Sequence, residues 1–365
     1  MFISLRHSLL VFIACIFLVC GCSYGPVNTP DLRDDPSIRL IDPNNGPFVI
    51  EQSRGVDPNN GETRRLPSIK WKPTRISPSL KDVHTFTIRY NSRQFRLTGQ
   101  VAIPVQMPGG QAYPALLDTG CPYQIYINDA VVRDCDLAVF PWGKHSGTGA
   151  LMGLCEIPSM EFANVTVTNP SCWYHQRQWQ FRIFGIPLYR HRTILIGLGL
   201  MRGFSYILFD NITQQVEFNP EDAFKPNNSS QWVNLPFVIE NRDKRRIMID
   251  ISLAGSHVHI EFDTGGFNSL ILQNAIWQNL KDGLEVRGGA DGKLRTNQYG
   301  DLPCRRYVLP ELHIGQATLQ NVRANILPDD SPFAQNVEGI ISLACFKKTI
   351  VVLDFKKNLL WLRRF

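Results

Sequence analysis

Several kinds of signal are missing from this sequence, and each absence narrows the possible functions. There is no long block of lysine and arginine despite a formal net charge of +6, and no zinc-finger or P-loop spacing, so nucleic acid is not an expected partner. No G-x-S-x-G segment offers a serine nucleophile. The histidines show no metal-ligand spacing; His257 and His259 point the same way on one strand, which is typical of a solvated face. We therefore expect neither a metal nor a cofactor.

The first residues, MFISLRHSLLVFIACIFLVCGC, combine a basic start with an apolar run that is too short to span a membrane comfortably. We interpret residues 1–21 as a signal peptide. Its end resembles the lipobox of bacterial lipoproteins, in which a small residue precedes the cysteine that is lipidated, and Cys22 after Gly21 fits that rule. The resemblance implies a lipid anchor in the bacterial cell envelope, and Ser23 favours the outer membrane, facing the periplasm. A plain secretory signal or an uncleaved anchor stays open.

Six cysteines follow this leader, an even number in a compartment that permits disulfide bonds. They are Cys121, Cys135, Cys155, Cys172, Cys304 and Cys345. Pairs of Cys121 with Cys135 and of Cys155 with Cys172 are the short-range options. Six cysteines allow about fifteen connectivities, so the sequence fixes no pairing.

Residues 22–83 are rich in proline, asparagine and aspartate, and the segment DPNNG occurs twice in them. Such a composition favours turns and extended segments over a packed core. We expect a tether that holds the folded part of the protein off the membrane. The alternative is a propeptide that lies across a cleft.

Beyond this segment the pattern changes to short apolar or alternating runs separated by glycine, proline and asparagine, which is typical of β-strands. Examples are HTFTIRYN, FRLTGQVAIPV, MIDISLAG and HVHIEFD. Long amphipathic helices are missing, and residues 273–283 are the best candidate for a short helix, ending at Gly283. The expected fold class is all-β.

One unit of sequence occurs twice. The segment HIEFDTGGFNSLILQNAI aligns with PALLDTGCPYQIYINDAV without a gap, so that Asp263 falls on Asp118. Each half later has an apolar run around a glycine. Gly197 lies 79 residues after Asp118, and Gly339 lies 76 residues after Asp263, so the spacing is repeated as well.

These residues resemble the aspartic peptidases of the pepsin and retropepsin clan, because Asp-Thr-Gly after an apolar strand and the later apolar-glycine run are both present twice. The resemblance covers residues 84–218 and 231–365, joined by a polar, proline-containing linker at 219–230. It implies an acid protease fold with two pseudo-symmetric, closed-barrel-like lobes and a cleft between them. It also implies that Asp118 and Asp263 are the catalytic pair, one from each lobe.

The chemistry explains why two acids are needed. One carboxylate alone cannot both take a proton from water and protonate the substrate. Two carboxyls at hydrogen-bond distance cannot both ionise, because like charges repel, so the pair holds one proton over a wide pH range. The ionised acid then acts as general base on a water molecule, and its protonated partner polarises the scissile carbonyl.

The family's pattern also assigns supporting roles to the neighbours of the two acids. The threonines would reach the backbone of the opposite loop, and the glycines would let backbone N–H groups approach the carboxylates. These supporting residues are Thr119, Gly120, Thr264 and Gly265. The sequence departs from the pattern at Cys121 and Gly266, where serine, threonine or alanine is usual. A thiol at Cys121 could pair with Cys135 or be oxidised and so regulate activity; the alternative is a buried small residue or a structural disulfide.

Peptidases of this clan close a hairpin over the substrate to exclude water. Two glycine-rich segments, HSGTGALMG and RGGADGKLR, begin 27 and 24 residues after their aspartates. The flap candidates within them are Gly147, Thr148, Gly149, Gly288 and Gly289. A surface hairpin without a lid role is the alternative for either segment. The aromatic and arginine-rich segment 171–192 suits a binding surface, or an ordinary insertion.

Taken together, these patterns predict an aspartic endopeptidase that hydrolyses envelope or secreted proteins without a cofactor. The expected partners are a peptide or protein substrate, bound extended in the cleft, and the membrane through Cys22. We expect a monomer, because both lobes lie on one chain. The alternative is a non-catalytic lipoprotein that uses this fold as a peptide-binding or scaffolding module. Two intact Asp-Thr-Gly turns favour the enzyme.

Overall fold

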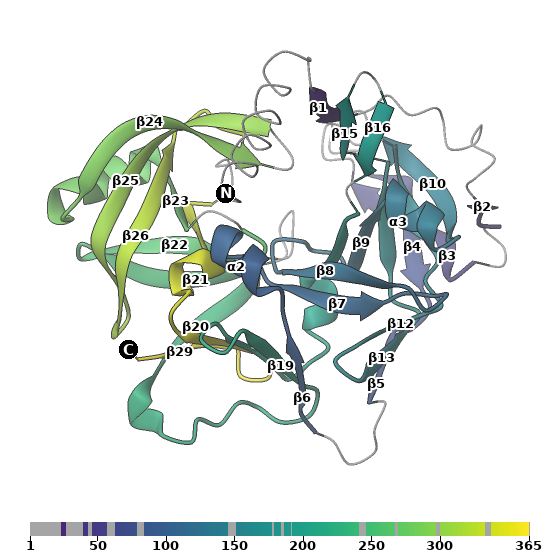
Figure 1. Cartoon of the computed structure of the whole chain (residues 1–365), viewed down its shortest axis with the longest axis horizontal. Helices are drawn as coiled ribbons and strands as arrows, with labels where there is room; N and C mark the ends of the chain where they lie inside the picture. Colours follow the sequence, from purple (N-terminus) through teal and green to yellow (C-terminus); the bar gives the residue numbers. More distant parts are fainter. Residues whose placement is uncertain are drawn as a thin grey trace, which may run out of the picture.

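The computed structural model describes residues 23–26, 39–42, 46–56, 63–78, 84–144, 151–176, 179–183, 186–190, 192–240, 246–266, 269–296, 300–332 and 337–364. This part of the chain is mostly β-strand with a few short helices, as the sequence pattern predicted (Figure 1). None of the helices in these ranges has the length and apolar character needed to cross a membrane.

Strands from the first half of the chain form an 11-stranded sheet. They are β2 (Arg39–Leu40), β5 (Arg75–Pro78), β7 (Ala102–Gln106), β8 (Ala112–Asp118), β9 (Ile125–Asn128), β10 (Ala138–Lys144), β11 (Leu151–Cys155), β12 (Ser159–Phe162), β13 (Val165–Thr168), β14 (Cys172–His175) and β17 (Ile194–Gly197). Their order is β2-β10-β11-β14-β9-β17-β8-β7-β12-β13-β5. Strand β8 is internal, antiparallel to β7 and parallel to β17, and its last residue pairs with Gly197 of β17.

A 13-stranded sheet holds most of the second half. Its strands from that half are β20 (Trp232–Glu240), β21 (Arg246–Leu253), β22 (Ser256–Asp263), β23 (Leu270–Gln273), β24 (Arg287–Thr296), β25 (Gly300–Ile314), β26 (Ala317–Leu327), β27 (Gly339–Ser342), β28 (Ile350–Asp354) and β29 (Leu359–Arg363). Strand β22 is antiparallel to β21 and parallel to β27. It therefore has the same kinds of neighbour as β8.

The first half contributes three strands to this second sheet, which ties the halves together. They are β6 (Phe86–Arg89), β18 (Tyr206–Asp210) and β19 (Gln215–Asn219). The sheet order is β24-β25-β26-β23-β27-β22-β21-β20-β29-β28-β18-β19-β6. The halves meet where β18 pairs antiparallel with β28, with Leu208 opposite Val352. Outward from this junction the first half contributes β18, β19 and β6, and the second half begins with β28, β29 and β20. In each half the innermost strand follows the apolar-glycine run.

The described residues within 22–83 form several strands. Besides β2 and β5, they contain β1 (Ser23–Pro26), β3 (Phe48–Val56) and β4 (Thr63–Trp71). β3 pairs with β4, and β1 pairs with β15 (Trp179–Ile183), which pairs with β16 (Ile186–Arg190). Ile41 and Phe48 are buried against Ala138 and Leu154 of the folded part. The expectation that this segment lacks a packed core was therefore wrong for its described residues, because two apolar side chains dock on the first sheet.

The helices are short and lie at the ends of strands. They are α2 (Ser92–Thr98), α3 (Asp129–Asp134), α4 (Leu198–Met201), α5 (Asn274–Leu280) and the 3-10 turns η2 (Ser229–Gln231), η3 (Lys281–Gly283) and η4 (Leu343–Phe346). The helix predicted at residues 273–283 is confirmed as α5 followed by η3. It forms because Trp277 and Leu280, three residues apart, bury on one face.

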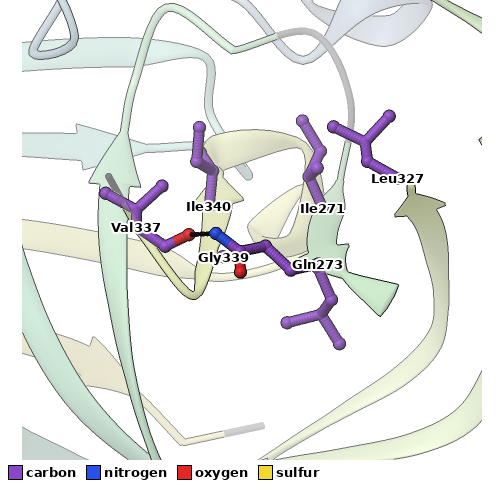
Figure 2. Close-up of a pocket in the computed structure, with 7 residues that line it drawn as sticks. Ile271, Gln273, Leu327, Val337, Gly339 and Ile340 are labelled. Atoms are coloured by element: carbon purple, nitrogen blue, oxygen red, sulfur yellow. Dashed lines mark hydrogen bonds between the residues drawn. The ribbon is translucent and has the colours of Figure 1, made fainter. Parts of the chain in front are cut away.

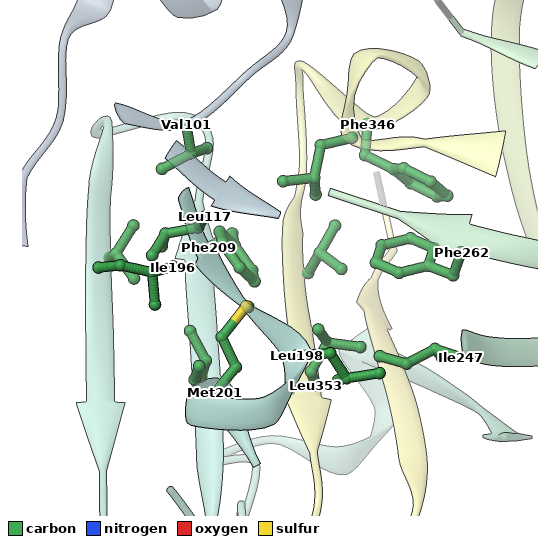
Figure 3. Close-up of a cluster of buried hydrophobic side chains, with 14 of the residues drawn as sticks. Val101, Leu117, Ile196, Leu198, Met201, Phe209, Ile247, Phe262, Phe346 and Leu353 are labelled. Atoms are coloured by element: carbon green, nitrogen blue, oxygen red, sulfur yellow. The ribbon is translucent and has the colours of Figure 1, made fainter. Parts of the chain in front are cut away.

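One apolar cluster runs through both halves. Figure 3 shows part of it, with Leu117 and Phe209 from the first half and Phe262 and Leu353 from the second. Leu117 and Phe262 are fully buried, and each directly precedes one of the two aspartates. The packing that stabilises the molecule therefore also fixes the strand ends from which the acids extend.

The linker at 219–230 is docked on the shared sheet rather than exposed throughout. Phe224 is buried and packs edge-on against Tyr206, Trp232 and Trp361. Its backbone N–H donates to Asp354 Oδ2 at 3.2 Å. Because most of the linker is polar, its composition did not indicate that Phe224 would anchor it to the sheet.

Candidate active site

Asp118 and Asp263 end equivalent strands. Asp118 is the last residue of β8 and lies opposite Gly197 in β17, and Asp263 is the last residue of β22 and lies opposite Ser342 in β27. Alternate residues before each acid are buried, as period-two patterning requires. A Cβ on Gly197 would lie closer than 3.0 Å to the carbonyl oxygen of Cys121, so glycine lets β17 pass directly beneath the first loop.

The two threonines exchange hydrogen bonds across the loops. Thr119 N–H donates to Thr264 Oγ1 at 3.0 Å, and Thr264 N–H donates to Thr119 Oγ1 at 2.9 Å. Each hydroxyl then donates to the opposite strand: Thr119 to Phe262 O at 2.9 Å and Thr264 to Leu117 O at 2.8 Å. Both side chains are fully buried. This reciprocal set of four bonds holds the two loops face to face.

The threonine exchange brings the two carboxyl groups into contact, and a side-chain hydrogen bond joins Asp118 to Asp263. A Cβ on Gly120 would be 3.0 Å from Asp263 Cγ and 3.2 Å from Asp118 Oδ1, so one point of the first loop touches both acids. A Cβ on Gly265 would lie closer than 3.0 Å to Asp118 Cγ. Glycine is therefore required in both loops for lack of space, and not for an unusual backbone angle.

The two acids differ in their tendency to hold a proton. Burial, the charge of Asp263 and the hydrogen bond that protonated Asp118 donates to Asp263 raise the pKa of Asp118 well above its ordinary value. Burial also raises the pKa of Asp263, but backbone N–H groups and the hydrogen bond from Asp118 oppose that rise. The nearest of these is Gly265 N–H, which donates to Asp263 Oδ1 at 2.8 Å. The two acids therefore titrate together as a pair, and each holds a proton more strongly than an isolated carboxyl group does.

A third carboxylate lies on the strand that leads to the site. Glu261 is two residues before Asp263 in β22, so both side chains leave the same face of the sheet. Its carboxylate is buried and pairs with the Arg246 guanidinium, with Nε 3.6 Å from Oε2. The charge of Glu261 contributes to the raised pKa of Asp118.

Some residues of the site were not found by sequence reasoning. One is Glu261, described above. The other is Gln100, whose side-chain amide donates to Gly265 O and so links the segment after α2 to the second loop. A Cβ on Gly266 would be 3.0 Å from Ser342 Cβ and 3.1 Å from Asp263 Oδ2, so Gly266 is a spatial requirement and not merely a missing hydroxyl. Glu261 was detectable as an acid inside an apolar strand. Gln100 left no sequence signal.

The flap candidates fall in two places. Gly147, Thr148 and Gly149 lie outside the described residues, as does Cys22. Gly288 and Gly289 lie at the start of β24, with φ of 93° and 118°, where the register with β25 shifts. The glycine pair thus forms a β-bulge at the base of a long hairpin, and the turn of that hairpin comes later in the sequence.

A small apolar pocket, open to solvent, lies beside β27. Figure 2 shows Ile271, Leu327 and Ile340 around it, and Gln273 Nε2 donating to Val337 O at 2.6 Å. In the parallel pair of β22 with β27, Ile340 is the register partner of Glu261. The pocket therefore lies on strands next to the one that ends in Asp263.

The histidines on β22 make surface contacts. The His259 ring lies 2.6 Å from Asp250 Oδ1 and 3.2 Å from Glu240 Oε1. Burial lowers the pKa of His259, but the hydrogen bonds to these two carboxylates outweigh it and raise the pKa. Among the residues that the structure describes, no group of three or more His, Cys, Asp or Glu side chains could hold a metal ion.

Comparisons with known proteins give little beyond this geometry. No protein-family model matches the chain, and no curated protein sequence matches it. Among solved structures, the crystal structure of basic 7S globulin from soybean is similar with a TM-score of 0.41 and 12% sequence identity, over 80% of this chain and 95% of that one.

Proposed function

We propose that this protein is an aspartic endopeptidase with the acid protease fold. The observation that carries the proposal is the hydrogen-bonded pair of Asp118 and Asp263 at the ends of equivalent strands. A buried pair of like acids is costly unless it has a use, and hydrolysis of an amide by water is a use that needs both. The reciprocal threonine bonds support the same conclusion, because they serve only to hold the two loops together.

We infer the roles of the two acids from their different hydrogen-bond partners. Asp263, the ionised partner, takes a proton from water as the water oxygen attacks the scissile carbonyl carbon. Asp118 gives its proton to the carbonyl oxygen, so a neutral tetrahedral diol forms. When the diol collapses, Asp263 passes its proton to the leaving nitrogen and Asp118 takes one from a hydroxyl. The pair ends with the single proton on Asp118, as it began.

The finer architecture belongs to the same proposal. Residues 84–218 and 231–365 would be two pseudo-symmetric, closed-barrel-like lobes with a substrate cleft between them. The matched neighbours of β8 and β22 support this description, as do the runs β18-β19-β6 and β28-β29-β20 on either side of the junction between the halves. An extended peptide would bind in the cleft.

The setting is also proposed. The chain would be lipidated at Cys22, anchored in the bacterial envelope and monomeric, and it would act on envelope or secreted proteins. Support comes from the sequence of the leader and from the presence of both aspartates on one chain. Mass spectrometry of the mature amino terminus tests the anchor: a lipid-modified cysteine is expected, and an intact leader would contradict it.

The activity is tested with unfolded envelope proteins as substrate, comparing wild type with Asp118→Asn across acidic and neutral pH. New peptide termini should appear with wild type and be absent with the variant. Asp282→Asn, which changes an exposed carboxylate of η3, is the matched control and should cleave like wild type. Peptides that bind wild type but emerge uncut at every pH would overturn the proposal and point to a peptide-binding module.

A further inference from the structure

Four cysteines of the first half lie near one another beneath the first aspartate loop. Cys155 and Cys172 are fully buried in the main apolar cluster, and Cys135 packs against that cluster. Cys121 is the third residue after Asp118, and its backbone N–H donates to Asp118 Oδ1 at 3.2 Å. All are present as thiols in this structure. Their arrangement distinguishes one pair from the others.

Cys155 and Cys172 face each other across two strands. They end β11 and begin β14, which are antiparallel, and they are direct register partners. Partners in an antiparallel ladder have Cα atoms about 4.5 to 5.5 Å apart, which lies within the range of about 4.4 to 6.8 Å found for disulfides. The two thiols are also in hydrogen-bond contact. In the described strands no other two cysteines share a register position.

We propose that Cys155 and Cys172 form a disulfide bond that ties β11 to β14. Pairing breaks two S–H bonds, forms one S–S bond and releases two protons. These two protons and the two electrons pass to the disulfide of an oxidised thiol–disulfide oxidoreductase, which becomes two thiols. Because neither cysteine has exposed surface in the folded chain, the exchange takes place before β11 and β14 have closed over the sulfurs.

The bond has a defined mechanical place in the molecule. Strand β11 pairs with β10 on one side and with β14 on the other, and β14 pairs with β9, the strand that follows the first aspartate loop. A covalent link between β11 and β14 therefore fastens the β10–β11 pair to the strands that carry the loop of Asp118. This inference does not depend on the proposed peptidase activity.

Differential labelling of the full chain tests the pairing. Protein refolded with oxidised glutathione is denatured and alkylated with N-ethylmaleimide, then reduced and alkylated with iodoacetamide. Cys155 and Cys172 should carry the second label, and an unreduced digest should contain one peptide pair joined through them. N-ethylmaleimide on both residues would overturn the inference. A disulfide from either residue to Cys121 or Cys135 would also overturn it.

A second measurement does not rely on the labels. Wild type refolded with a reductant should melt roughly 5 °C lower than wild type refolded with oxidised glutathione. The double variant C155A/C172A should melt at one temperature under both conditions, whereas Cys135→Ala, the matched control, should keep the difference. A difference that persists in the double variant contradicts the proposal. If that variant does not fold, the labelling of wild type still decides.

Discussion

The two Asp-Thr-Gly loops are alike in what holds them and different in what surrounds their acids. The threonines are interchangeable: each accepts from the other's N–H and donates to the other strand's carbonyl. The two carboxyl groups, in contrast, differ in the backbone N–H groups that they accept from. Asp263 accepts an N–H bond of 2.8 Å from Gly265, whereas the N–H bond to Asp118 from Cys121 is 3.2 Å long. A symmetric frame thus carries two acids with different hydrogen-bond partners.

Among the residues around the two acids, the glycines should have the largest effect, and the effect should differ between Gly120 and Gly265 because the space beside them differs. An alanine at Gly265 would place its Cβ within 3.0 Å of Asp118 Cγ, whereas one at Gly120 would sit 3.0 Å from Asp263 Cγ, so Asp118 must move further. A misplacement of about 1 Å costs on the order of 10²-fold in rate. Gly265→Ala should therefore lose roughly 100-fold in kcat/KM and Gly120→Ala clearly less. Equal losses in the two variants would show that the loops are sterically equivalent.

The threonine exchange gives the next largest effect, this time on stability. Thr119→Ala leaves the Thr264 N–H and the Phe262 carbonyl buried without this partner. Each such group costs about 1 to 3 kcal/mol, so the free energy of unfolding should fall by roughly 2 to 4 kcal/mol. Thr119→Ser keeps the hydroxyl and should fall by much less. Denaturant unfolding of both variants measures the difference, and an alanine variant as stable as the serine variant would contradict the bonding described here.

Stability should also report the cost of the paired acids. The folded-state pKa of Asp118 is raised above its ordinary value of 3.8, so the folded protein binds more protons than the unfolded chain. That contribution to stability is fully present below pH 3.8 and is lost as pH rises through the folded-state pKa. Asp118→Asn should therefore melt a few degrees higher than wild type near neutral pH and show no such gain in strong acid. Melting curves of both proteins at the two pH values test this prediction, and an equal gain at both values would contradict it.

The smallest effect should come from Glu261. Its negative charge raises the pKa of Asp118, so Glu261→Gln should lower that pKa and move the alkaline limb of the pH–activity profile toward acid. Because the change leaves Arg246 without this buried partner, folding of the variant is checked first by its melting curve. Asp250→Asn, on an exposed position of β21, is the control and should leave the limb in place. If the alkaline limb does not move in the Glu261 variant, the charge of Glu261 does not affect the pKa of Asp118.

Sequence reasoning was most successful where a periodic pattern was repeated. The ungapped alignment of the two halves already placed Asp118 and Asp263 at matching strand ends, because strand register follows the buried alternation. Sequence reasoning was wrong where it inferred packing from composition alone. Ile41 and Phe48 dock on Ala138 and Leu154, far along the chain, and the local composition cannot indicate such distant partners.

Glycine content was a partial guide in the same way. Glycine content predicted Gly288 and Gly289 as part of a flap, and both residues have positive φ. It could not tell a bulge at the base of the β24–β25 hairpin from the turn at its end, because either needs residues free of a Cβ. The long hairpin itself became apparent only from the pairing of its strands.

The central claim is that Asp118 and Asp263 work as one unit, and a double-mutant comparison of peptide cleavage tests it most directly. Asp118→Asn and Asp263→Asn should each lower kcat by about 10³-fold or more, and the double variant should be no slower than either single one. That non-additivity is the signature of one shared proton. A single variant that keeps near wild-type cleavage, or losses that multiply in the double variant, would contradict it.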